Sequence, residues 1–455
     1  MKSLTLKEIA KAVNGKISNN SNNVFITGVT TDTRNVKEND IFIPIKGEKF
    51  DGHDFILQAF EKGAICSLSC ENIVVPEGKY IIYVEDTRKA LRDLAQYYRL
   101  SFPTLSVVAI TGSVGKTTTK DIIASVLSQK FNVLKTEGNF NNEIGLPLTV
   151  FNLNENHEVA VLEMGMNNFG EISRLSKIAR PDIAVITNVG VSHIENLGSR
   201  EGILKAKCEI FDYFKNGLAV LNVDDDMLIT IDKKLDCSIS WFGIENKRDI
   251  YTDNIEYNGI NSINCTICTP KGNFDVSINI PGKHMIFNAM SATAVGLHLG
   301  LTLEQIKKGI EEFTPTKMRM SVIELKNNTT IINDSYNANP ISMKSAIDVL
   351  AKAKKERIAI LGDMLELGDF ADNMHYEVGE YAAIKGIDKI ICIGELSKNI
   401  YNGSLNKGGN VYYFKTKDEF FKSSVFNQCI GNTVLIKASR VMNFENIAEK
   451  LQGVE

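Results

Sequence analysis

One short segment has the residue types of a phosphate-binding loop. Its members are Thr111, Gly112, Ser113, Val114, Gly115, Lys116, Thr117 and Thr118. Lys116 could neutralise phosphate oxygens, and the Thr117 hydroxyl is placed to bind the magnesium that accompanies ATP. Ile110 stands where the full motif has its first glycine. The alternative is a glycine turn with a solvated lysine, but a strand before the loop and a helix after it favour nucleotide binding.

The elements that position this loop are predicted on either side of it. Leu105 to Ile110 reads as a buried strand, and a helical stretch runs from Thr117 to about Lys130. Further strand-like runs are separated by enough chain for crossover helices, and they cover 159–164, 182–189 and 218–223. We therefore expect a mostly parallel α/β sheet, with a small antiparallel excursion at 250–282, where polar and apolar residues alternate.

A second alternating series begins near Thr330. Its predicted strands cover 330–334, 357–363, 389–394 and 433–439, with helical segments between them. Before residue 104 the predicted strands are short and mixed, and Thr5 to Glu8 has the spacing of a capping box. The segment 313–316 is a plausible linker. We predict an α/β protein of three domains: a small mixed domain at 1–104, a central P-loop domain at 105–313 and a Rossmann-like domain at 314–455.

Composition excludes several classes of protein. With 455 residues the chain exceeds the size of one hydrophobic core, which stops growing at roughly 250 to 300 residues. The 51 basic and 55 acidic side chains nearly cancel, so nucleic acid is not an expected partner. The amino terminus lacks the apolar run of a signal peptide, and no later stretch has the length of a membrane span, so we expect a cytoplasmic protein. The 8 cysteines show no zinc-like spacing of pairs, and we expect reduced strand thiols.

Two further side chains follow predicted strands. Glu163 ends the run that begins at Val159, and His193 follows the run at 182–189, so both fall at the edge where α/β sheets place ligands. From their types alone, Glu163 could equally be a surface acid, and His193 is more often a loop or packed histidine.

The shortened loop resembles the signature of the Mur ligases and folylpolyglutamate synthases, which form amide bonds through an acyl phosphate. Within the Mur ligases, three segments look like the branch that adds D-alanyl-D-alanine, and they are Asp334 to Pro340, Leu361 to Gly368 with His375, and Gly138 to Asn142. Two amino-terminal segments, Thr31 to Arg34 and Asp51 to Phe55, resemble the part that binds a uridine nucleotide. Turn and cap residues are the alternative for both.

The resemblance implies roles for residues of the reaction centre. Glu163 and His193 match magnesium ligands, and two cations would hold the crowded negative charge of the reaction. Lys207 matches the lysine that related ligases carbamylate with carbon dioxide, which turns a cation into a carboxylate. The alternative is a lysine on a helix surface, and the choice of Lys207 over Lys205 rests on the pattern Ala-Lys-x-x-Ile-Phe.

It also implies the residues that bind the substrates. Asn288 matches an asparagine that contacts the adenine, and the alternative is an asparagine that caps the start of a helix. Arg319 and Asp334 would hold the γ-phosphate and the ribose, and the alternative is a charged pair in solvent. The expected substrate-binding residues are Thr31, Asp32, Arg34, Asn139, Asn142, Tyr336, Asn337, Asn339, Lys437 and Arg440. For Asn139 to Asn142 an Asx-rich turn is the alternative. Ala438 departs from the family, which more often has glycine there.

The implied activity is a ligation that consumes ATP. ATP with Mg²⁺ would phosphorylate the carboxylate of a UDP-N-acetylmuramoyl-tripeptide, and the amine of D-alanyl-D-alanine would displace the phosphate. We expect a monomer. A folylpolyglutamate-type ligase is the nearest rival, although it should lack the Asp334 to Pro340 run, and an ATP-hydrolysing switch protein is the rival from another class. The third residue of the tripeptide, diaminopimelate or lysine, and the range of dipeptides depend on pocket shape.

Overall fold

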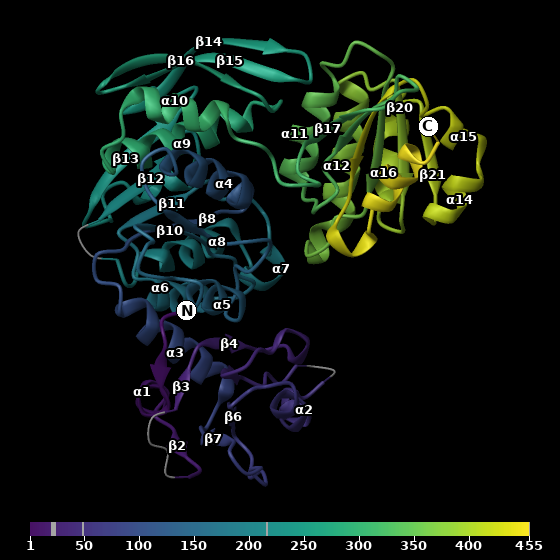
Figure 1. The fold of residues 1–455 in the computed structure, drawn as a ribbon. Coiled ribbons are helices and arrows are strands. Elements are labelled where there is room, and N and C mark those ends of the chain that lie inside the picture. Colours follow the sequence, from purple (N-terminus) through teal and green to yellow (C-terminus); the bar gives the residue numbers. More distant parts are fainter. Residues whose placement is uncertain (20–23, 48–49, 215–216, 455) are drawn as a thin grey trace. The chain divides into compact units, whose positions relative to one another are not determined.

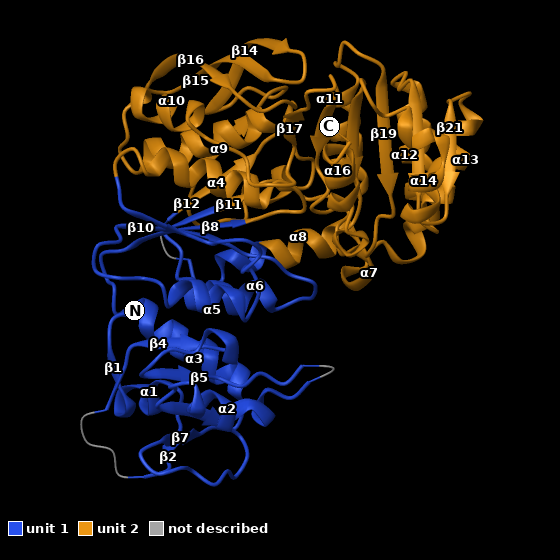
Figure 2. Ribbon diagram, turned by 45° about the vertical axis from the view of Figure 1, so that its right-hand side comes forward, with its two compact units in different colours: residues 1–110, 131–184, 208–217 blue, residues 111–130, 185–207, 218–455 orange. Residues whose placement is uncertain are grey.

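The computed structural model describes residues 1–19, 24–47, 50–214 and 217–454 (Figure 1). Clustering of contacts divides the chain into two compact units, coloured separately in Figure 2. The first unit comprises residues 1–110, 131–184 and 208–217, and the second comprises 111–130, 185–207 and 218–455. The predicted α/β class is confirmed, since helices alternate with strands through most of the chain.

A five-stranded sheet forms the amino-terminal part of the first unit. Its strand order is β2 (Lys16–Ile17), β7 (Tyr80–Tyr83), β6 (Cys66–Ser69), β5 (Asp40–Phe42) and β4 (Gly28–Thr30). Strands β4 to β7 pair in parallel, so their carboxyl ends share one edge of the sheet. A separate pair consists of β1 (Leu4–Thr5) and β3 (Phe25–Ile26). Apolar residues of β5 and β7 pack with α2 (Ile56–Glu61) to form the core here.

Two other helices of the first unit illustrate how local sequence sets helix ends. Helix α1 (Leu6–Ala12) begins with the predicted capping box, in which Thr5 and Glu8 each hydrogen-bond the other's backbone. Helix α3 (Thr87–Leu100) begins at Asp86, whose carboxylate accepts from two backbone amides of the first turn. Helix α3 packs against α5 (Gly145–Val150) and α6 (Glu171–Ala179).

The predicted central strands are confirmed. They are β8 (Ser106–Thr111), β10 (Val159–Glu163), β11 (Ile183–Ile186) and β12 (Leu218–Asn222), members of one nine-stranded sheet. The sequence patterns did not reveal two further members, β9 (Val133–Lys135) and β13 (Ser238–Gly243). The expected antiparallel excursion is also present, as β14 (Ile250–Asn258), β15 (Ser262–Thr269) and β16 (Gly272–Ile278). Cys265 and Cys268 are buried free thiols in β15.

Helices of the second unit pack beside the phosphate-binding segment. The predicted helix after the loop is α4 (Lys116–Leu127), which contacts α9 (His284–His298) and α10 (Leu303–Glu311). Two shorter helices carry candidate residues, α7 (Ile194–Leu197) and α8 (Arg200–Cys208). Among the described residues no helix is both long and apolar enough to cross a membrane.

The carboxy-terminal part of the second unit is a six-stranded sheet. Its order is β17 (Ser321–Glu324), β18 (Thr330–Asn333), β22 (Thr433–Lys437), β19 (Arg357–Gly362), β20 (Lys389–Ile393) and β21 (Val411–Phe414). All pairs are parallel except that of β17 with β18. Four of these strands confirm the predicted series, whereas β17 and β21 had no clear signal. Isoleucines of the sheet pack with Phe420, Phe426 and Phe444 in a continuous core.

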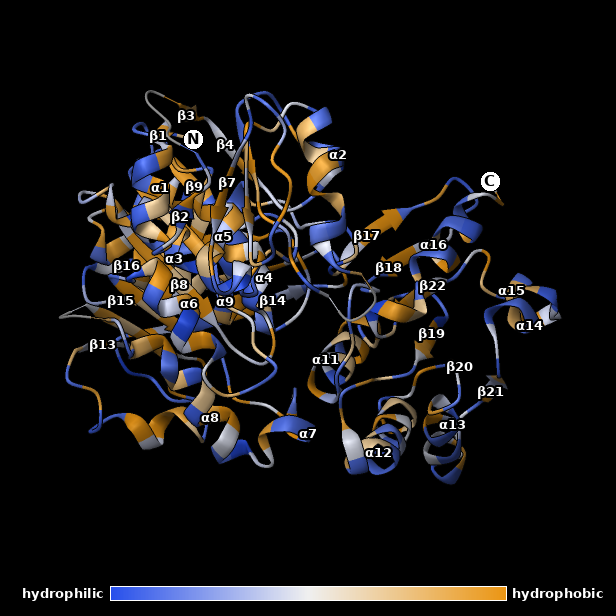
Figure 3. Ribbon diagram, turned by 90° about the horizontal axis from the view of Figure 1, so that it is seen from below, coloured by the Kyte–Doolittle hydropathy of each residue, from blue (hydrophilic) through white to orange (hydrophobic). Residues whose placement is uncertain are grey.

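Helices surround this sheet. They are α11 (Pro340–Leu350), α12 (Ala371–Ile384), α13 (Ser397–Asn406), α14 (Lys417–Lys422), α15 (Ser424–Asn427) and α16 (Glu445–Gln452). Helices such as α12 and α13 carry both hydrophobic and hydrophilic colours in Figure 3, as expected for helices with one face on a sheet.

Glycine allows α12 and α13 to pack at very short range. A Cβ atom on Gly379 would lie 2.0 Å from the carbonyl oxygen of Ile400, and one on Gly403 would lie 2.0 Å from that of Tyr376. We expect Gly379→Ala to lower the local stability of these helices by about 1–3 kcal/mol, the cost of overpacking. Hydrogen–deuterium exchange of peptides from α12 and α13 measures this change.

The direction of the change in exchange rate distinguishes a close helix contact from an open position. Alanine has a higher helix propensity than glycine by about 1 kcal/mol, so Gly379→Ala would slow exchange if the position were open. Lys398→Ala, at an exposed position of α13, serves as the control and should change stability by no more than about 0.5 kcal/mol. Slower exchange in Gly379→Ala would contradict the close approach.

Candidate active site

The loop after β8 is held in place by the segment that follows β11. Backbone amides of Ser113 and Val114 donate to the backbone and side-chain oxygens of Asn188, at 3.1 and 2.9 Å. The Thr187 hydroxyl donates to the Val114 carbonyl at 2.7 Å. Gly112 has a φ of 154°, and a Cβ there would lie 1.9 Å from the Thr187 oxygen, so glycine is required. The loop geometry is thus fixed by contacts outside the loop.

The charged and hydroxyl groups of the loop lie at the start of α4. Gly115, in the left-handed conformation with a φ of 86°, precedes the first helical residue, Lys116. The Lys116 ammonium donates to the Gly112 carbonyl at 2.8 Å, so its stem lies back across the loop. Thr117 is buried in the first turn. Amides at a helix start with a lysine above them form a site for phosphate.

Asn288 reaches the same helix start from α9. Its side-chain oxygen accepts from the Thr119 hydroxyl at 2.9 Å and lies 3.5 Å from the position of a Cβ on Gly115. Asn288 lies in the second turn of α9 and is buried, so the alternative of a helix-start cap does not apply. The structure therefore brings Asn288 to the phosphate-binding loop.

Glu163 is a buried carboxylate with one unsatisfied oxygen. It ends β10 in the first unit, and its side chain is 2% exposed. One carboxylate oxygen accepts from the Asn141 amide at 2.7 Å, whereas Oε2 is buried without a hydrogen-bond partner among the described residues. A buried carboxylate oxygen without a donor is unfavourable unless a cation or another donor approaches it. The surface-acid alternative is excluded by this burial.

The asparagines on either side of Asn141 make contacts within the turn. The Asn142 side chain accepts from the amides of Ile144 and Gly145, at 3.1 and 2.8 Å, and so supports the start of α5. The backbone of Asn139 accepts from Asn141 at 2.7 Å. These contacts are those of the Asx-rich turn considered above, and the turn presents Asn141 to Glu163.

His193 and Lys207 differ in exposure. His193 has a φ of 62°, precedes α7, and places Nδ1 3.1 Å from the carboxylate of Glu366. The hydrogen bond from His193 lowers the pKa of Glu366. Lys207 is buried in α8 with 2% exposure, whereas Lys205 is exposed. The helix-surface alternative therefore describes Lys205 and not Lys207.

The buried Lys437 and the half-buried Asp334 form a pair at the ends of β22 and β18. The ammonium nitrogen lies 2.5 Å from Asp334 Oδ2 and 2.9 Å from the carbonyl oxygen of Asn337. Asp334 Oδ1 accepts from the Met320 amide at 3.1 Å. The Arg319 guanidinium instead stacks on the Tyr336 ring, 4.0 Å from its centroid. Asp334 thus pairs with Lys437. The alternative of a solvated pair between Arg319 and Asp334 is wrong.

Three other motif residues have structural contacts. Asn339 caps α11 through the Ser342 amide at 2.8 Å and also donates to the Ser192 hydroxyl at 3.0 Å. His375 is buried, accepts from the Met364 amide at 2.8 Å, and so holds the loop that leads to Glu366. The exposed Arg440 pairs with Glu445 at 2.6 Å.

The amino-terminal candidates lie after β4. Asp32 caps a short 3₁₀ turn that contains Thr33 and Arg34 and accepts from the Arg34 amide at 2.9 Å. The Arg34 guanidinium also donates to both Asp32 oxygens, and the hydrogen bond from this side chain lowers the pKa of Asp32. Asp32 therefore acts as a cap residue, which was the alternative for this segment, and Thr31 is its neighbour in the chain. Arg34 remains largely exposed, so it is available to an anionic ligand.

Comparisons with known proteins cover almost the whole chain. Three family models match: the Mur ligase family catalytic domain at 25–99, the Mur ligase middle domain at 110–296 and the Mur ligase glutamate ligase domain at 318–440. The chain is 40% identical to UDP-N-acetylmuramoyl-tripeptide–D-alanyl-D-alanine ligase of Bacillus subtilis, over 98% of both chains. It belongs to the Mur ligase family.

Solved Mur ligase structures agree with this assignment. MurF from Acinetobacter baumannii superposes with a TM-score of 0.93 at 32% identity, covering 100% of this chain and 99% of that one. MurF from Thermotoga maritima, solved in complex with ADP, gives a TM-score of 0.82 at 31% identity over 93% and 97% of the two chains. The resemblance drawn from the loop and from the D-alanyl-D-alanine-adding segments is thereby confirmed.

The Mur ligase fold brings residues into the site that sequence patterns did not single out. Thr187 and Asn188 hold the phosphate-binding loop, and Asn141 binds Glu163. Glu366, which reaches His193, lies within a quoted motif but had been given no role. Polar residues just after strands were the available signal, since that edge carries ligands in α/β sheets.

Proposed function

We propose that this Mur ligase joins D-alanyl-D-alanine to UDP-N-acetylmuramoyl-tripeptide in the cytoplasm, forming the pentapeptide, ADP and phosphate for peptidoglycan synthesis. The observation that carries the proposal is the match to the Bacillus subtilis ligase over 98% of both chains. The phosphate-binding loop supports the use of ATP, as does the ADP named for the Thermotoga maritima relative. We expect the active form to be a monomer.

The reaction needs an activated carboxylate because an amine does not displace a carboxylate oxygen directly. The γ-phosphoryl group of ATP moves to the tripeptide carboxylate and ADP leaves. The dipeptide amine then attacks the acyl carbon, loses a proton and expels inorganic phosphate. As the family motifs imply, Lys116 and the amides at the start of α4 would bind the ATP phosphates, Asn288 would contact the adenine, and Arg319 and Asp334 would contact the γ-phosphate and ribose.

Magnesium is the cofactor that these residues fit. The unsatisfied Glu163 oxygen is suited to a cation, and His193, Thr117 and a carbamylated Lys207 would complete the ligand sets. Lys207 is buried whereas Lys205 is exposed, and this burial supports the choice of Lys207 over Lys205. Bound Mg²⁺ would neutralise the negative charge that gathers on the transferring phosphoryl group.

Substrate contacts are assigned by the family motifs. Thr31, Asp32 and Arg34 bind the uridine nucleotide, and Asn139 with Asn142 lies near its pyrophosphate or the tripeptide. The peptide-binding residues are Tyr336, Asn337, Asn339, Lys437 and Arg440. The three domains run 1–104, 105–313 and 314–455, and the family matches at 25–99, 110–296 and 318–440 support this division.

The test is phosphate release from the purified protein with ATP and Mg²⁺. We expect release only when UDP-N-acetylmuramoyl-tripeptide and D-alanyl-D-alanine are both present, with a pentapeptide product identified by mass. Release that ignores both compounds would favour a nucleotide-hydrolysing switch and overturn the proposal. Parallel reactions with diaminopimelate or lysine as the third residue determine the tripeptide specificity.

Glu163→Gln tests the assignment of the metal ligand. Glutamine keeps the size of the side chain and an oxygen for Asn141 but removes the charge, so the Mg²⁺ concentration for half-maximal phosphate release should rise at least about 10-fold. Glu158→Gln, at the exposed residue just before the same strand, is the matched control and should leave the Mg²⁺ dependence unchanged. Equal Mg²⁺ dependence in wild type and Glu163→Gln would exclude Glu163 as a ligand.

A further inference from the structure

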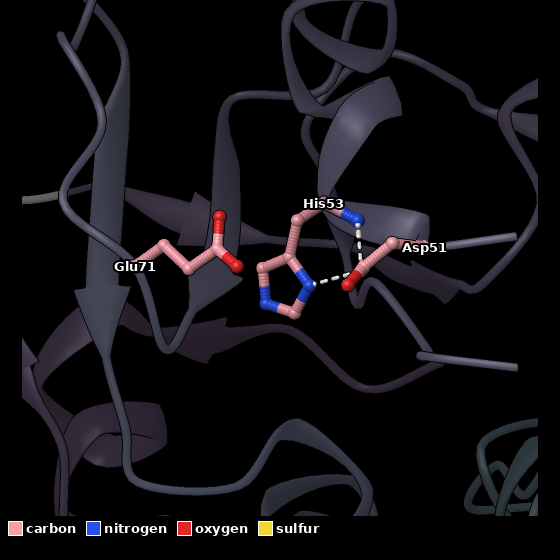
Figure 4. Close-up of side chains that lie close together, drawn as sticks. All are labelled: Asp51, His53 and Glu71. Carbon is pink, nitrogen blue, oxygen red and sulfur yellow. Dashed lines mark hydrogen bonds and ion pairs between the residues drawn. The ribbon is translucent and has the colours of Figure 1, made fainter.

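Two acids of the first unit differ in how their carboxylate oxygens are satisfied. Asp51 Oδ1 accepts from the His53 amide at 3.0 Å and lies 2.7 Å from the ring nitrogen Nδ1 (Figure 4). Its other oxygen pairs with the Lys46 ammonium at 3.3 Å, and His53 Nε2 lies 3.1 Å from the Cys70 sulfur. Glu163 is more deeply buried than Asp51, yet its Oε2 has no hydrogen-bond partner among the described residues. The open oxygen of Glu163 therefore needs an explanation that Asp51 does not.

One contact decides which oxygen of Glu163 stays open. The side-chain nitrogen of Asn141 donates to Glu163 Oε1 at 2.7 Å. Because a carboxylate oxygen only accepts, the nitrogen of the Asn141 amide, and not its oxygen, must face Glu163. The last torsion of a glutamate side chain is broad, so without a donor the carboxylate could rotate and its two oxygens could change places. The hydrogen bond from Asn141 therefore fixes the carboxylate group and leaves Oε2 as the oxygen without a donor.

Backbone contacts hold both partners of this hydrogen bond. The Asn141 amide donates to the Asn139 carbonyl at 2.7 Å, and the Asn141 carbonyl accepts from the Gly165 amide at 2.8 Å. A Cβ on Gly165 would lie 3.1 Å from the carbon, nitrogen and oxygen of the Asn141 side-chain amide, so glycine leaves room for that amide. The backbone amide of Glu163 donates to the Thr136 hydroxyl at 3.0 Å. The donor and the acceptor are thus positioned independently of each other, and their side chains meet at a short distance.

We propose that Asn141 is a positioning residue for the metal ligand Glu163, because it holds Oε1 and keeps Oε2 available to the Mg²⁺ of the ligase reaction. The inference rests on the proposed function, in which Glu163 binds Mg²⁺. This ion demands nearly ideal octahedral geometry, so a ligand oxygen that is held in place binds it better than one that rotates. Asn141 acts through Glu163 and does not contact the cation. Its role is distinct from that of Asn139 and Asn142, which are expected to bind the substrate.

The experiment measures the binding of Mn²⁺, which takes the same oxygen ligands as Mg²⁺ and whose free concentration is read by electron paramagnetic resonance. The full chain is saturated with an ATP analogue that has a methylene group between its β and γ phosphorus atoms, so no phosphoryl group is transferred. Asn141→Leu keeps the approximate size of the side chain but has no donor, and we expect it to weaken Mn²⁺ binding about 10- to 100-fold. Asn152→Leu, the same substitution at an exposed position of the first unit, should bind Mn²⁺ as wild type does.

A double-mutant cycle with Glu163→Ala tests whether Asn141 acts through Glu163. Glu163→Ala alone should weaken Mn²⁺ binding, and adding Asn141→Leu should cause no further loss, because the carboxylate that Asn141 holds is gone. An equal loss from Asn141→Leu in both backgrounds would overturn the inference, since Asn141 would then contact the cation or the nucleotide itself, or support the fold in general. The melting temperature without metal and nucleotide checks that each variant folds. If Asn141→Leu does not fold, Asn141→Ala, which adds no bulk beside Gly165, replaces it in the cycle.

The single variants separate the failure of this inference from the failure of the proposed metal site. Wild-type Mn²⁺ binding in Asn141→Leu, together with weaker binding in Glu163→Ala, would overturn the positioning role and leave Glu163 as a metal ligand. Wild-type Mn²⁺ binding in Glu163→Ala would remove Glu163 from the metal site and overturn both. Weaker binding in each single variant, with no further loss in the double variant, is the result that supports the inference.

Discussion

Lys116→Ala is expected to reduce phosphate release with both substrates by on the order of 100- to 1,000-fold, the usual effect of removing one group that stabilises transition-state charge. Lys116 begins α4 and donates to the Gly112 carbonyl, so its ammonium is held over the loop before ATP binds. Removing this charge should affect the turnover number more than the fold. Steady-state phosphate release and the melting temperature together measure the two effects.

Lys308→Ala is the control for Lys116→Ala. Lys308 lies on an exposed face of α10, and its ammonium is 3.8 Å from the Glu312 carboxylate, so its loss should leave the rate within about twofold of wild type, in line with surface substitutions generally. If Lys116→Ala retained wild-type turnover, the lysine would be the solvated turn residue of the alternative interpretation and the ATP site would lie elsewhere.

Lys207→Ala is expected to lower the turnover number by on the order of 100-fold because it removes the group proposed to bear the carbamate beside magnesium. Lys207 is buried, whereas Lys205 on the same helix is exposed. Enzyme equilibrated with ¹³C-labelled bicarbonate should show one carbamate carbon by NMR, and Lys207→Ala should lack it.

Two further variants separate carbamylation from a simple charge effect. Lys205→Ala, on the exposed side of the same helix, should retain wild-type turnover. Lys207→Arg keeps a positive charge but cannot form the carbamate, so it should be as impaired as Lys207→Ala. Full activity in Lys207→Arg would mean that a cation, and not a carbamate, is needed at this position.

The central and carboxy-terminal strands were predictable because each is a short apolar run bounded by turn residues. The runs at 159–164 and 218–223 correspond to β10 and β12, which are wholly buried. By contrast, β9 has three residues of intermediate burial, and β21 is also intermediate throughout. Edge strands of this kind have one neighbour and little apolar periodicity, so their pairing becomes evident only in the assembled sheet.

The candidate site, like the strands, could be predicted only in part from the sequence. The phosphate-binding loop could be read from adjacent residues because its chemistry depends on consecutive amides, one lysine and one hydroxyl. Asp334 was named from a motif, but its partner Lys437 lies 103 positions away, and spacing could not pair them. The choice of Lys207 over Lys205 came from the pattern Ala-Lys-x-x-Ile-Phe, and the structure adds that Lys207 is buried and Lys205 is exposed.

The sequence by itself determined the fold class, the nucleotide-binding loop and the family, because these follow from hydrophobic periodicity and from contiguous motifs. Only the tertiary structure decided which polar groups meet: Asn188 behind the loop, Asn141 on Glu163, Lys437 on Asp334 and Cys70 on His53. These contacts join residues from different strands and helices, so their geometry depends on how the sheets order their strands. Contiguous motifs can be recognised in the sequence, whereas the site forms where the ends of separate strands come together in the fold.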